Sequence, residues 1–148
     1  MNKIEGFIHH LECPSVNGII FSDRTIQLFE VEISWERPTE FKLQTSSTTS
    51  IDDLEKTGEL YWSSCAILDE FIDETGSIKA FCGEASHGSD GFIGIMDLNK
   101  EKVIWIAFFN SSNPFNKVTI EDEQVTAVST IKNVWKFNIN KPTIIEVI

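Results

Sequence analysis

Apolar and polar residues alternate strictly in the segment 29–36. The apolar positions are Phe29, Val31, Ile33 and Trp35, and the polar positions are Glu30, Glu32, Ser34 and Glu36. A period of two with aromatic and β-branched residues on one side is typical of a half-buried strand. We therefore expect a strand here, with the four apolar side chains inside and three glutamates facing solvent.

The same pattern continues on both sides of this segment. A strand is expected near 18–21, joined to the first by the turn 22–24, and Pro38 should end the pairing because proline cannot donate to a β-ladder. Further along, 71–73 and 77–82 form a hairpin around 74–76, with Gly76 in the left-handed conformation. Segments 92–98 and 102–109 pair through 99–101. Val103 to Phe109 is apolar throughout, which predicts a central strand covered on both faces.

The C-terminal third also reads as strands. Segments 118–120 and 125–129 flank the acidic turn Glu121-Asp122-Glu123. Trp135, Phe137 and Ile139 alternate with polar residues, and Pro142 precedes a last strand at 144–147. The turns near residues 75, 100 and 122 are roughly regular in spacing, but the sequences around them are too dissimilar to form a repeat.

Two segments are expected to depart from the strand pattern. The run 45–50 contains only Ser and Thr, which favours a mobile polar loop. After it, Ser50 can cap a short helix near 51–57 that Gly58 ends, with Asp52 and Asp53 in its first turn. Residues 60–72 fit either a helix or a buried strand, and we favour the strand.

These elements predict a single domain, 1–148, that is mostly β. The expected fold is an antiparallel meander forming a curved sheet, partial barrel or sandwich, with one short helix near 51–57. The alternative is an α+β fold with a helix at 63–73 packed on one sheet face. A chain of 148 residues buries enough surface to fold without disulfides or metals.

Composition bears on where the protein works. The first residues lack the apolar stretch of a secretory signal, and the longest apolar run, 103–109, is too short to cross a bilayer. Three cysteines (Cys13, Cys65 and Cys82) have no metal-like spacing and suggest a reducing compartment. We therefore expect a cytoplasmic protein.

Net charge is the property farthest from average. The chain carries 23 acidic and 12 basic residues, a net charge of −11. Residues 1–74 contain 15 acids and 5 bases, whereas 75–148 contain 8 and 7. Such a balance repels nucleic acid and anionic membranes and speeds encounter with a cationic protein. Solubility alone is the simpler explanation of the same charge.

No pattern in the chain indicates catalysis, a cofactor or a metal site. His9 and His10 are adjacent and would point to opposite sides of a strand. Cys82, His87 and Asp90 supply the residue types of a nucleophilic site, but His87 and Asp90 lie in the glycine-rich segment 83–91, which we interpret as an irregular loop. Neither a nucleophile elbow nor a phosphate-binding loop is present. We therefore expect no catalytic, cofactor-binding or metal-binding residue.

The candidate partner-binding residues are acids of the N-terminal half together with two aromatic residues. They are Glu30, Glu32, Glu36, Asp52, Asp53, Tyr61, Trp62, Asp69, Glu70, Asp73 and Glu74. If the fold gathers these acids, they form a surface of one sign suited to a basic protein. Tyr61 or Trp62 would be the exposed anchor, with Phe115 as a second candidate, while Trp35, Trp105 and Trp135 are expected in the core.

These properties suggest a non-catalytic cytoplasmic binding protein. The leading hypothesis is an acidic bacterial immunity or inhibitor protein that neutralises a basic, nuclease-type toxin by covering its active site. The alternative is a small β-barrel that binds an apolar or carbohydrate ligand through aromatic residues. An enzyme that uses scattered carboxylates is a third possibility. Salt dependence separates the first two, because electrostatically steered association slows as salt is added.

Overall fold

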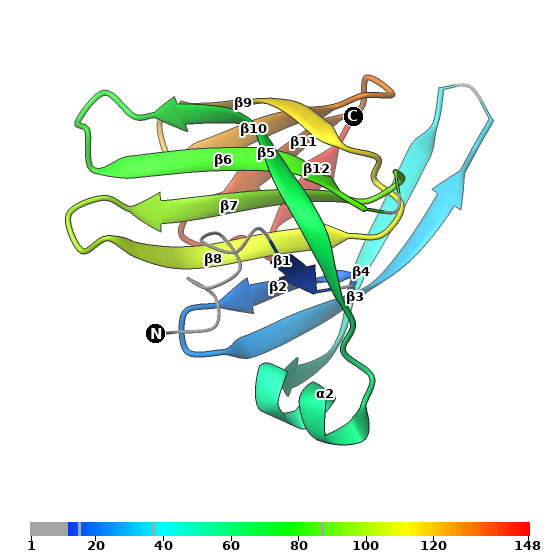
Figure 1. Ribbon diagram of the computed structural model, residues 1–148. Helices are drawn as coiled ribbons and strands as arrows, with labels where there is room; N and C mark the ends of the chain where they lie inside the picture. Colours follow the sequence, from blue (N-terminus) through cyan, green and yellow to red (C-terminus); the bar gives the residue numbers. More distant parts are fainter. Residues whose placement is uncertain (1–11, 15, 37, 87) are drawn as a thin grey trace.

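The computed structural model describes residues 12–14, 16–36, 38–86 and 88–148, and this part of the chain is mostly β (Figure 1). Its strands form two antiparallel sheets with open edges, one in the order β1-β5-β6-β7-β8-β2-β3-β4 and the other in the order β12-β11-β10-β9. The fold is therefore a curved sandwich, and the predicted fold class is confirmed.

The elements follow one another along the chain with short connections. The strands of the larger sheet are β1 (Glu12–Pro14), β2 (Gly18–Phe21), β3 (Thr25–Ser34), β4 (Glu40–Ser50), β5 (Trp62–Ile72), β6 (Ile78–Ala85), β7 (Gly91–Asp97) and β8 (Lys102–Phe109). The smaller sheet contains β9 (Phe115–Glu121), β10 (Gln124–Ser129), β11 (Val134–Asn138) and β12 (Ile145–Val147), and the single described helix is α2 (Ile51–Thr57).

Strand β8 is the central element that the sequence predicts. It pairs with β7 on one side and with β2 on the other. Its side chains alternate between two cores: Trp105, Ala107 and Phe109 face the smaller sheet, whereas Ile106 and Phe108 face the opposite side. A continuous apolar strand is stable here because both of its faces are covered.

The inner core fills the space between the two sheets with aromatic rings. Trp135 is fully buried, and its ring centroid lies 4.9 Å from that of Phe109, 5.5 Å from Phe115 and 5.2 Å from Phe41. Trp105 reaches across the core, where its indole N–H donates to the carbonyl of Ile139 at 2.9 Å. The predicted burial of Trp105 and Trp135 is thus confirmed.

An outer core lies on the other face of the larger sheet. Ile51 and Leu54 of α2 pack there with phenylalanines from β6, β7 and β8. The ring of Phe81 packs directly over Gly94 of β7, where a Cβ atom would lie 2.0 Å from Cζ of Phe81. A glycine is required here for packing, and its φ angle is not the reason.

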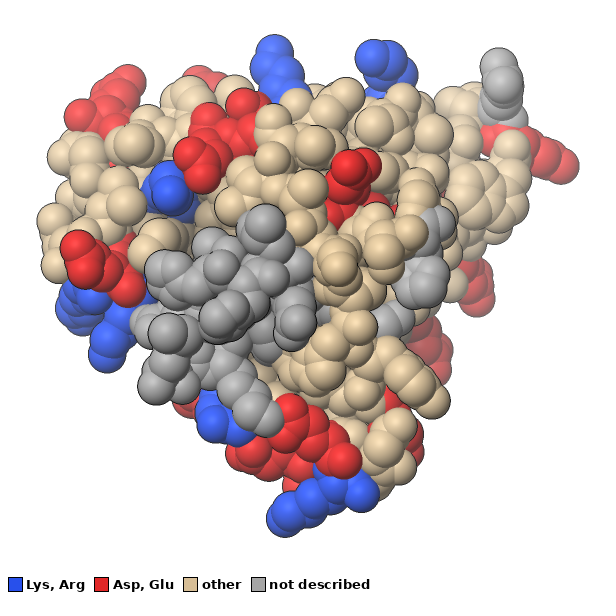
Figure 2. All heavy atoms as spheres, in the orientation of Figure 1, with Lys and Arg blue, Asp and Glu red and all other residues tan. Residues whose placement is uncertain are grey.

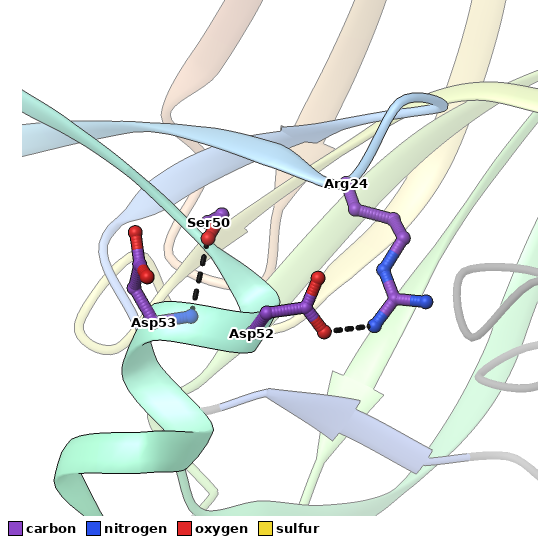
Figure 3. A network of polar contacts seen from close by, with 4 residues as sticks. All are labelled: Arg24, Ser50, Asp52 and Asp53. Carbon is purple, nitrogen blue, oxygen red and sulfur yellow. Dashed lines mark hydrogen bonds and ion pairs between the residues drawn. The ribbon is translucent and has the colours of Figure 1, made fainter.

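The helix α2 begins and ends at the predicted residues. The Ser50 side chain accepts a hydrogen bond from the backbone N–H of Asp53 at 3.1 Å (Figure 3). Gly58 closes the helix in the left-handed conformation with φ 73°. Arg24, in the turn between β2 and β3, forms an ion pair with Asp52. This ion pair connects the first turn of α2 to the β2–β3 turn.

Three local predictions are wrong. Residues 45–50 belong to β4, where Thr45, Thr48, Thr49 and Ser50 pair with β3, so the polar run is an exposed edge strand and no loop. The α+β alternative fails because 63–73 contributes to β5 and the turn after it. The expected irregular loop starts only after Ala85, because Gly83 lies within β6. A Cβ atom at Gly83 would lie 1.9 Å from the carbonyl oxygen of Ala66 on the neighbouring strand.

The predicted turns are confirmed where the structure describes them. Gly76 has a φ angle of 73° between β5 and β6. The turn 99–101 joins β7 to β8, the acidic turn 121–123 lies between β9 and β10, and Pro142 precedes β12.

Candidate binding surface

The far half of the β3–β4 hairpin, residues 30–36 and 38–44, projects beyond the sandwich at the right of Figure 1 and is called the arm here. Its register places Glu30 opposite Gln44, Glu32 opposite Lys42 and Ser34 opposite Glu40. All six of these side chains are exposed, so they form a polar face. The arm is therefore an amphipathic ribbon with an acidic outer face.

The other face of the arm is apolar and half-buried. Val31 lies opposite Leu43 and Ile33 opposite Phe41. Three of these residues, Val31, Phe41 and Leu43, pack against the inner core. The alternation in the sequence correctly predicted which side of β3 faces inward.

Trp35, just beyond β3, is not in the core as predicted but 60% exposed. Its ring centroid lies 6.4 Å from that of Phe41, which in turn contacts Trp135. The rings thus form a continuous path from the end of the arm to the inner core. Trp35 is exposed because pairing has ended at Ser34 and Phe41 alone offers it a ring partner among the described residues. An exposed indole is a favourable protein-binding anchor.

The acids of the arm have no intramolecular role among the described residues. Glu30, Glu32, Glu36 and Glu40 form neither a hydrogen bond nor an ion pair through their carboxylates with any residue that the structure describes. Glu40 was absent from the sequence-based candidates, because only the hairpin register brings it beside Glu32 and Lys42. These carboxylates are free to meet a cationic partner.

Most other predicted acids are engaged within the protein. Asp69 accepts a hydrogen bond from the backbone N–H of Val118 at 2.9 Å and so links the two sheets, while Nζ of Lys79 lies 3.5 Å from Oε1 of Glu70. Asp73 organises the turn after β5, where its carboxylate accepts from the N–H groups of Ser77 and Ile78. The hydrogen bond from Ile78, with those from Thr75 and Ser77, lowers the pKa of Asp73 despite opposing desolvation. Of the predicted acids outside the arm, Asp53 and Glu74 are exposed without such a role toward the described residues.

The fold separates the candidate acids into three groups. One lies on the arm, one on α2 at the base of the same hairpin, and one on β5 and its turn. Four strands of the sheet stand between β3 and β5. Acidic side chains are accordingly spread over the face shown in Figure 2, with one cluster over α2 at the bottom. The described residues therefore offer three separate acidic groups and no single acidic surface.

The predicted aromatic anchors fall in different environments. Tyr61 is 71% exposed, just before β5, whereas Trp62 is half-buried against the outer core. Phe115 is wrong as an exposed candidate, because it begins β9 and is fully buried against Trp135. The Asn/Ser-rich segment that precedes Phe115 resembles an exposed loop in sequence, and only sheet packing buries the ring.

A groove of about 890 Å³ runs between the arm and the smaller sheet. Phe41 of β4 forms one wall, and Ile131, Asn133, Val147 and Ile148 contribute to the other. Asn133 ties the two walls together, since its Nδ2 donates to the carbonyl of Thr39 at 3.0 Å. Sequence reasoning missed this feature, because its walls come from segments 94 residues apart.

The candidate nucleophile Cys82 is fully buried in the inner core. Burial, with the charge of Asp69 adding to it, raises the pKa of the Cys82 thiol to about 12. The thiolate is the reactive form of cysteine, so this thiol is inert near neutral pH. His9, His10 and His87 lie outside the residues that the structure describes. Among the described residues, no three His, Cys, Asp or Glu side chains form a group that could hold a metal ion.

Comparisons with known proteins place the chain in no family. No protein-family model matches the sequence, and no curated protein matches it. In the described part of the chain, none of the helical structure is both long and apolar enough to cross a bilayer.

Proposed function

We propose that this protein is a non-catalytic binding protein that neutralises a basic partner protein through the arm. In its most specific form, the proposal is a bacterial immunity or inhibitor protein that acts in the cytoplasm. Its partner would be a nuclease-type toxin whose cationic active site it covers. The observation that carries the proposal is the arm itself, which carries four exposed glutamates and, at its end, an exposed tryptophan.

The energetics of the arm favour this use. Glutamates two apart on a strand are about 7 Å from each other. At that distance they repel by about 0.6 kcal/mol in water, so the free protein tolerates them easily. A cationic partner replaces this repulsion with attraction and raises the association rate. Trp35 then supplies the apolar contact that slows dissociation.

The size of the arm suits such an interface. A standard protein–protein interface buries about 800 Å² on each partner. The polar face of the arm, with Trp35 at its end, supplies part of such a surface. Acids at the rim contribute mainly to association rate, while an acid paired with a buried cation of the partner contributes several kcal/mol.

Binding of a small ligand inside a barrel fits this geometry less well. The two sheets have open edges, and aromatic side chains fill the space between them. An apolar or carbohydrate ligand would have to use the surface groove beside Phe41. Its affinity would change little with salt, in contrast to that of a basic protein.

The direct test is co-expression with the protein encoded beside this gene. We expect a neighbouring gene for a large secreted protein with a basic C-terminal domain, whose expression alone arrests growth. Co-expression of the present chain should restore growth, and the two purified proteins should form a complex whose association slows as salt is raised. A basic neighbouring domain that remains toxic and unbound in the presence of this chain would refute the proposal, as would a neighbourhood without such a domain.

A further inference from the structure

The arm meets the smaller sheet through a hydrogen bond and a ring contact that lie two residues apart. Nδ2 of Asn133, just before β11, donates to the carbonyl of Thr39 at 3.0 Å. Two residues further along both segments, the ring centroid of Phe41 lies 5.2 Å from that of Trp135. Among the described residues, no other hydrogen bond or ion pair joins the arm to a part of the chain outside its own hairpin. The bond to Thr39 is the one directional contact between the two.

A projecting ribbon needs such a contact to have a defined direction. Two strands alone are marginally stable in water, and the arm adds to its cross-strand pairs only the packing of its apolar face on the inner core. Apolar packing is non-directional, so it holds the ribbon against the core without fixing its angle. A hydrogen bond requires a narrow range of distance and angle, so the bond to Thr39 can fix that angle.

Asn133 is itself held in place by the turn 129–133. The N–H of Ser129 donates to the carbonyl of Asn133 at 2.9 Å, and the N–H of Asn133 donates to Oγ of Ser129 at 3.2 Å. The N–H of Lys132 closes the same turn on the carbonyl of Ser129 at 2.9 Å. Ser129 is fully buried, so the turn is anchored in the smaller sheet. The amide of Asn133 is therefore presented to the arm from a fixed backbone.

The side-chain amide of Asn133 is paired on one side only. The residue is 7% exposed, and its Oδ1 accepts no hydrogen bond from any described residue. The desolvation of an unpaired buried acceptor costs at least as much free energy as one neutral hydrogen bond contributes. An apolar side chain of similar shape would fill this place without that cost. The amide therefore adds little to folding stability, and its bond to Thr39 matters for the direction of the arm.

We propose that Asn133 is a positioning residue, whose bond to Thr39 sets the direction in which the acidic face of the arm and Trp35 point. Without this bond the arm should keep its hairpin register but sample a range of angles. For partner binding the inference rests on the proposed function, because the arm is the surface that meets the partner. A partner of a loosened arm must order it on binding, which lowers the affinity.

The first test compares variants of the free protein. Asn133→Leu keeps the branching of the side chain but has no N–H donor, and Asn133→Ala removes the amide without adding bulk. Asn138→Ala is the matched control at the other end of β11, where Oδ1 of Asn138 accepts from the N–H groups of Asn140 and Lys141. Backbone hydrogen exchange and the indole N–H signal of Trp35 are followed by NMR.

Both Asn133 variants should accelerate exchange in the arm by about fivefold or more, the factor expected for one lost hydrogen bond. The Trp35 indole signal should shift or broaden, while exchange in β6, β7 and β8 stays within about twofold of the wild type. The control should leave the arm within about twofold. An unchanged arm in both Asn133 variants would overturn the inference. So would faster exchange spread evenly over both sheets, or a failure of both variants to fold, because Asn133 would then be a general stability element.

The second test uses the basic domain encoded beside this gene. Asn133→Leu leaves every carboxylate of the arm in place, so the salt dependence of the association rate should match that of the wild type. The affinity should fall by about fivefold or more, and that of Asn138→Ala by less than about twofold. A loosened arm with wild-type affinity, or an altered salt dependence, would overturn the role of Asn133 in binding. A basic domain that binds while the arm is unaffected by Asn133→Leu would refute the positioning role alone. An arm that loosens as expected in a chain that binds no basic domain would refute the proposed function alone.

Discussion

Replacing Gly94 by alanine should destabilise the protein far more than an ordinary glycine substitution in a strand. The new Cβ would lie 2.0 Å from Cζ of Phe81 and 2.4 Å from its Cε2. Carbon atoms in contact lie about 3.5–4.0 Å apart, so the ring would have to retreat by about 1.5 Å. Phe81 is 1% exposed and packs against Phe92 at a centroid distance of 6.2 Å, so this movement would disturb the packing of the outer core. We expect a loss of about 3 kcal/mol, at the upper end of the usual cost of overpacking.

A double-mutant cycle isolates the contact between the two residues. Phe81→Ala alone should cost about 4 kcal/mol, since it opens a cavity in the outer core. In that background Gly94→Ala should cost nothing or stabilise by up to about 1 kcal/mol, because the methyl group enters empty space and alanine suits a strand better than glycine. The coupling energy should therefore be about 3 kcal/mol or more. Denaturant titration followed by tryptophan fluorescence measures each free energy of unfolding.

Gly76 provides the control for this cycle. It has a φ angle of 73°, and no described atom lies within 4 Å of the place that an added Cβ would take. Gly76→Ala therefore tests backbone conformation alone and should cost about 1 kcal/mol. If Gly94→Ala costs no more than Gly76→Ala, or costs the same with and without the Phe81 ring, the packing argument is wrong.

Three further predictions concern buried and polar groups. Asp69→Ala should cost about 1–3 kcal/mol in thermal or chemical unfolding, because the N–H of Val118 loses its acceptor, and an unchanged stability would contradict the inter-sheet link. The Cys82 thiol, with its pKa raised to about 12 by burial, should resist alkylation in the native protein at pH 8 and react only after denaturation. The hydrogen bond from the Ile78 N–H is the largest cause of the lowered pKa of Asp73 in the folded protein. The ionised Asp73 carboxylate therefore stabilises the fold above about pH 4, and this contribution should be lost as pH falls through the folded pKa. Asp73→Ala should show a weaker loss of stability than the wild type over that acid range.

Alternation in the sequence was sufficient for the strands that have one buried and one exposed face. Strand β3 and the β11 residues Trp135 and Phe137 were assigned correctly, because a period of two has a single structural meaning when one side is aromatic or β-branched. The continuous apolar run of β8 was equally informative, since a strand that is covered on both faces needs apolar residues at every position. Both patterns depend only on the strand itself and on which of its faces meets solvent.

Sequence reasoning failed where a residue's environment depends on distant segments. The Ser/Thr run in β4 is polar because it lies at a sheet edge, and such a run has the same composition as a loop. Trp35 has the pattern of a core residue, but it lies just past the last paired residue of β3. Asp69 follows an irregularity in the β5 register and meets the backbone of Val118 on the other sheet. None of these outcomes follows from neighbouring residues alone.

The candidate site was only partly accessible from sequence for the same reason. The acids of β3 were identified correctly as exposed, but Glu40 became part of their surface only through hairpin pairing. The groove was missed because Thr39 and Asn133 are brought together by the packing of two sheets. Oδ1 of Asn133 in this groove accepts no hydrogen bond from the described residues, and the local sequence cannot predict this property.

The most direct test of the central claim compares two charge reversals in binding to the basic partner. One variant changes Glu30, Glu32 and Glu36 of the arm to lysine, and the control changes Glu121, Asp122 and Glu123 of the exposed β9–β10 turn in the same way. Both variants gain the same net charge, so a difference between them reports where the partner binds. The association rate is measured from low to high salt. The arm variant should associate about tenfold or more slowly and lose most of its salt dependence, whereas the control should change much less. A control that weakens binding as much as the arm variant, or more, would contradict the assignment of the arm as the binding surface.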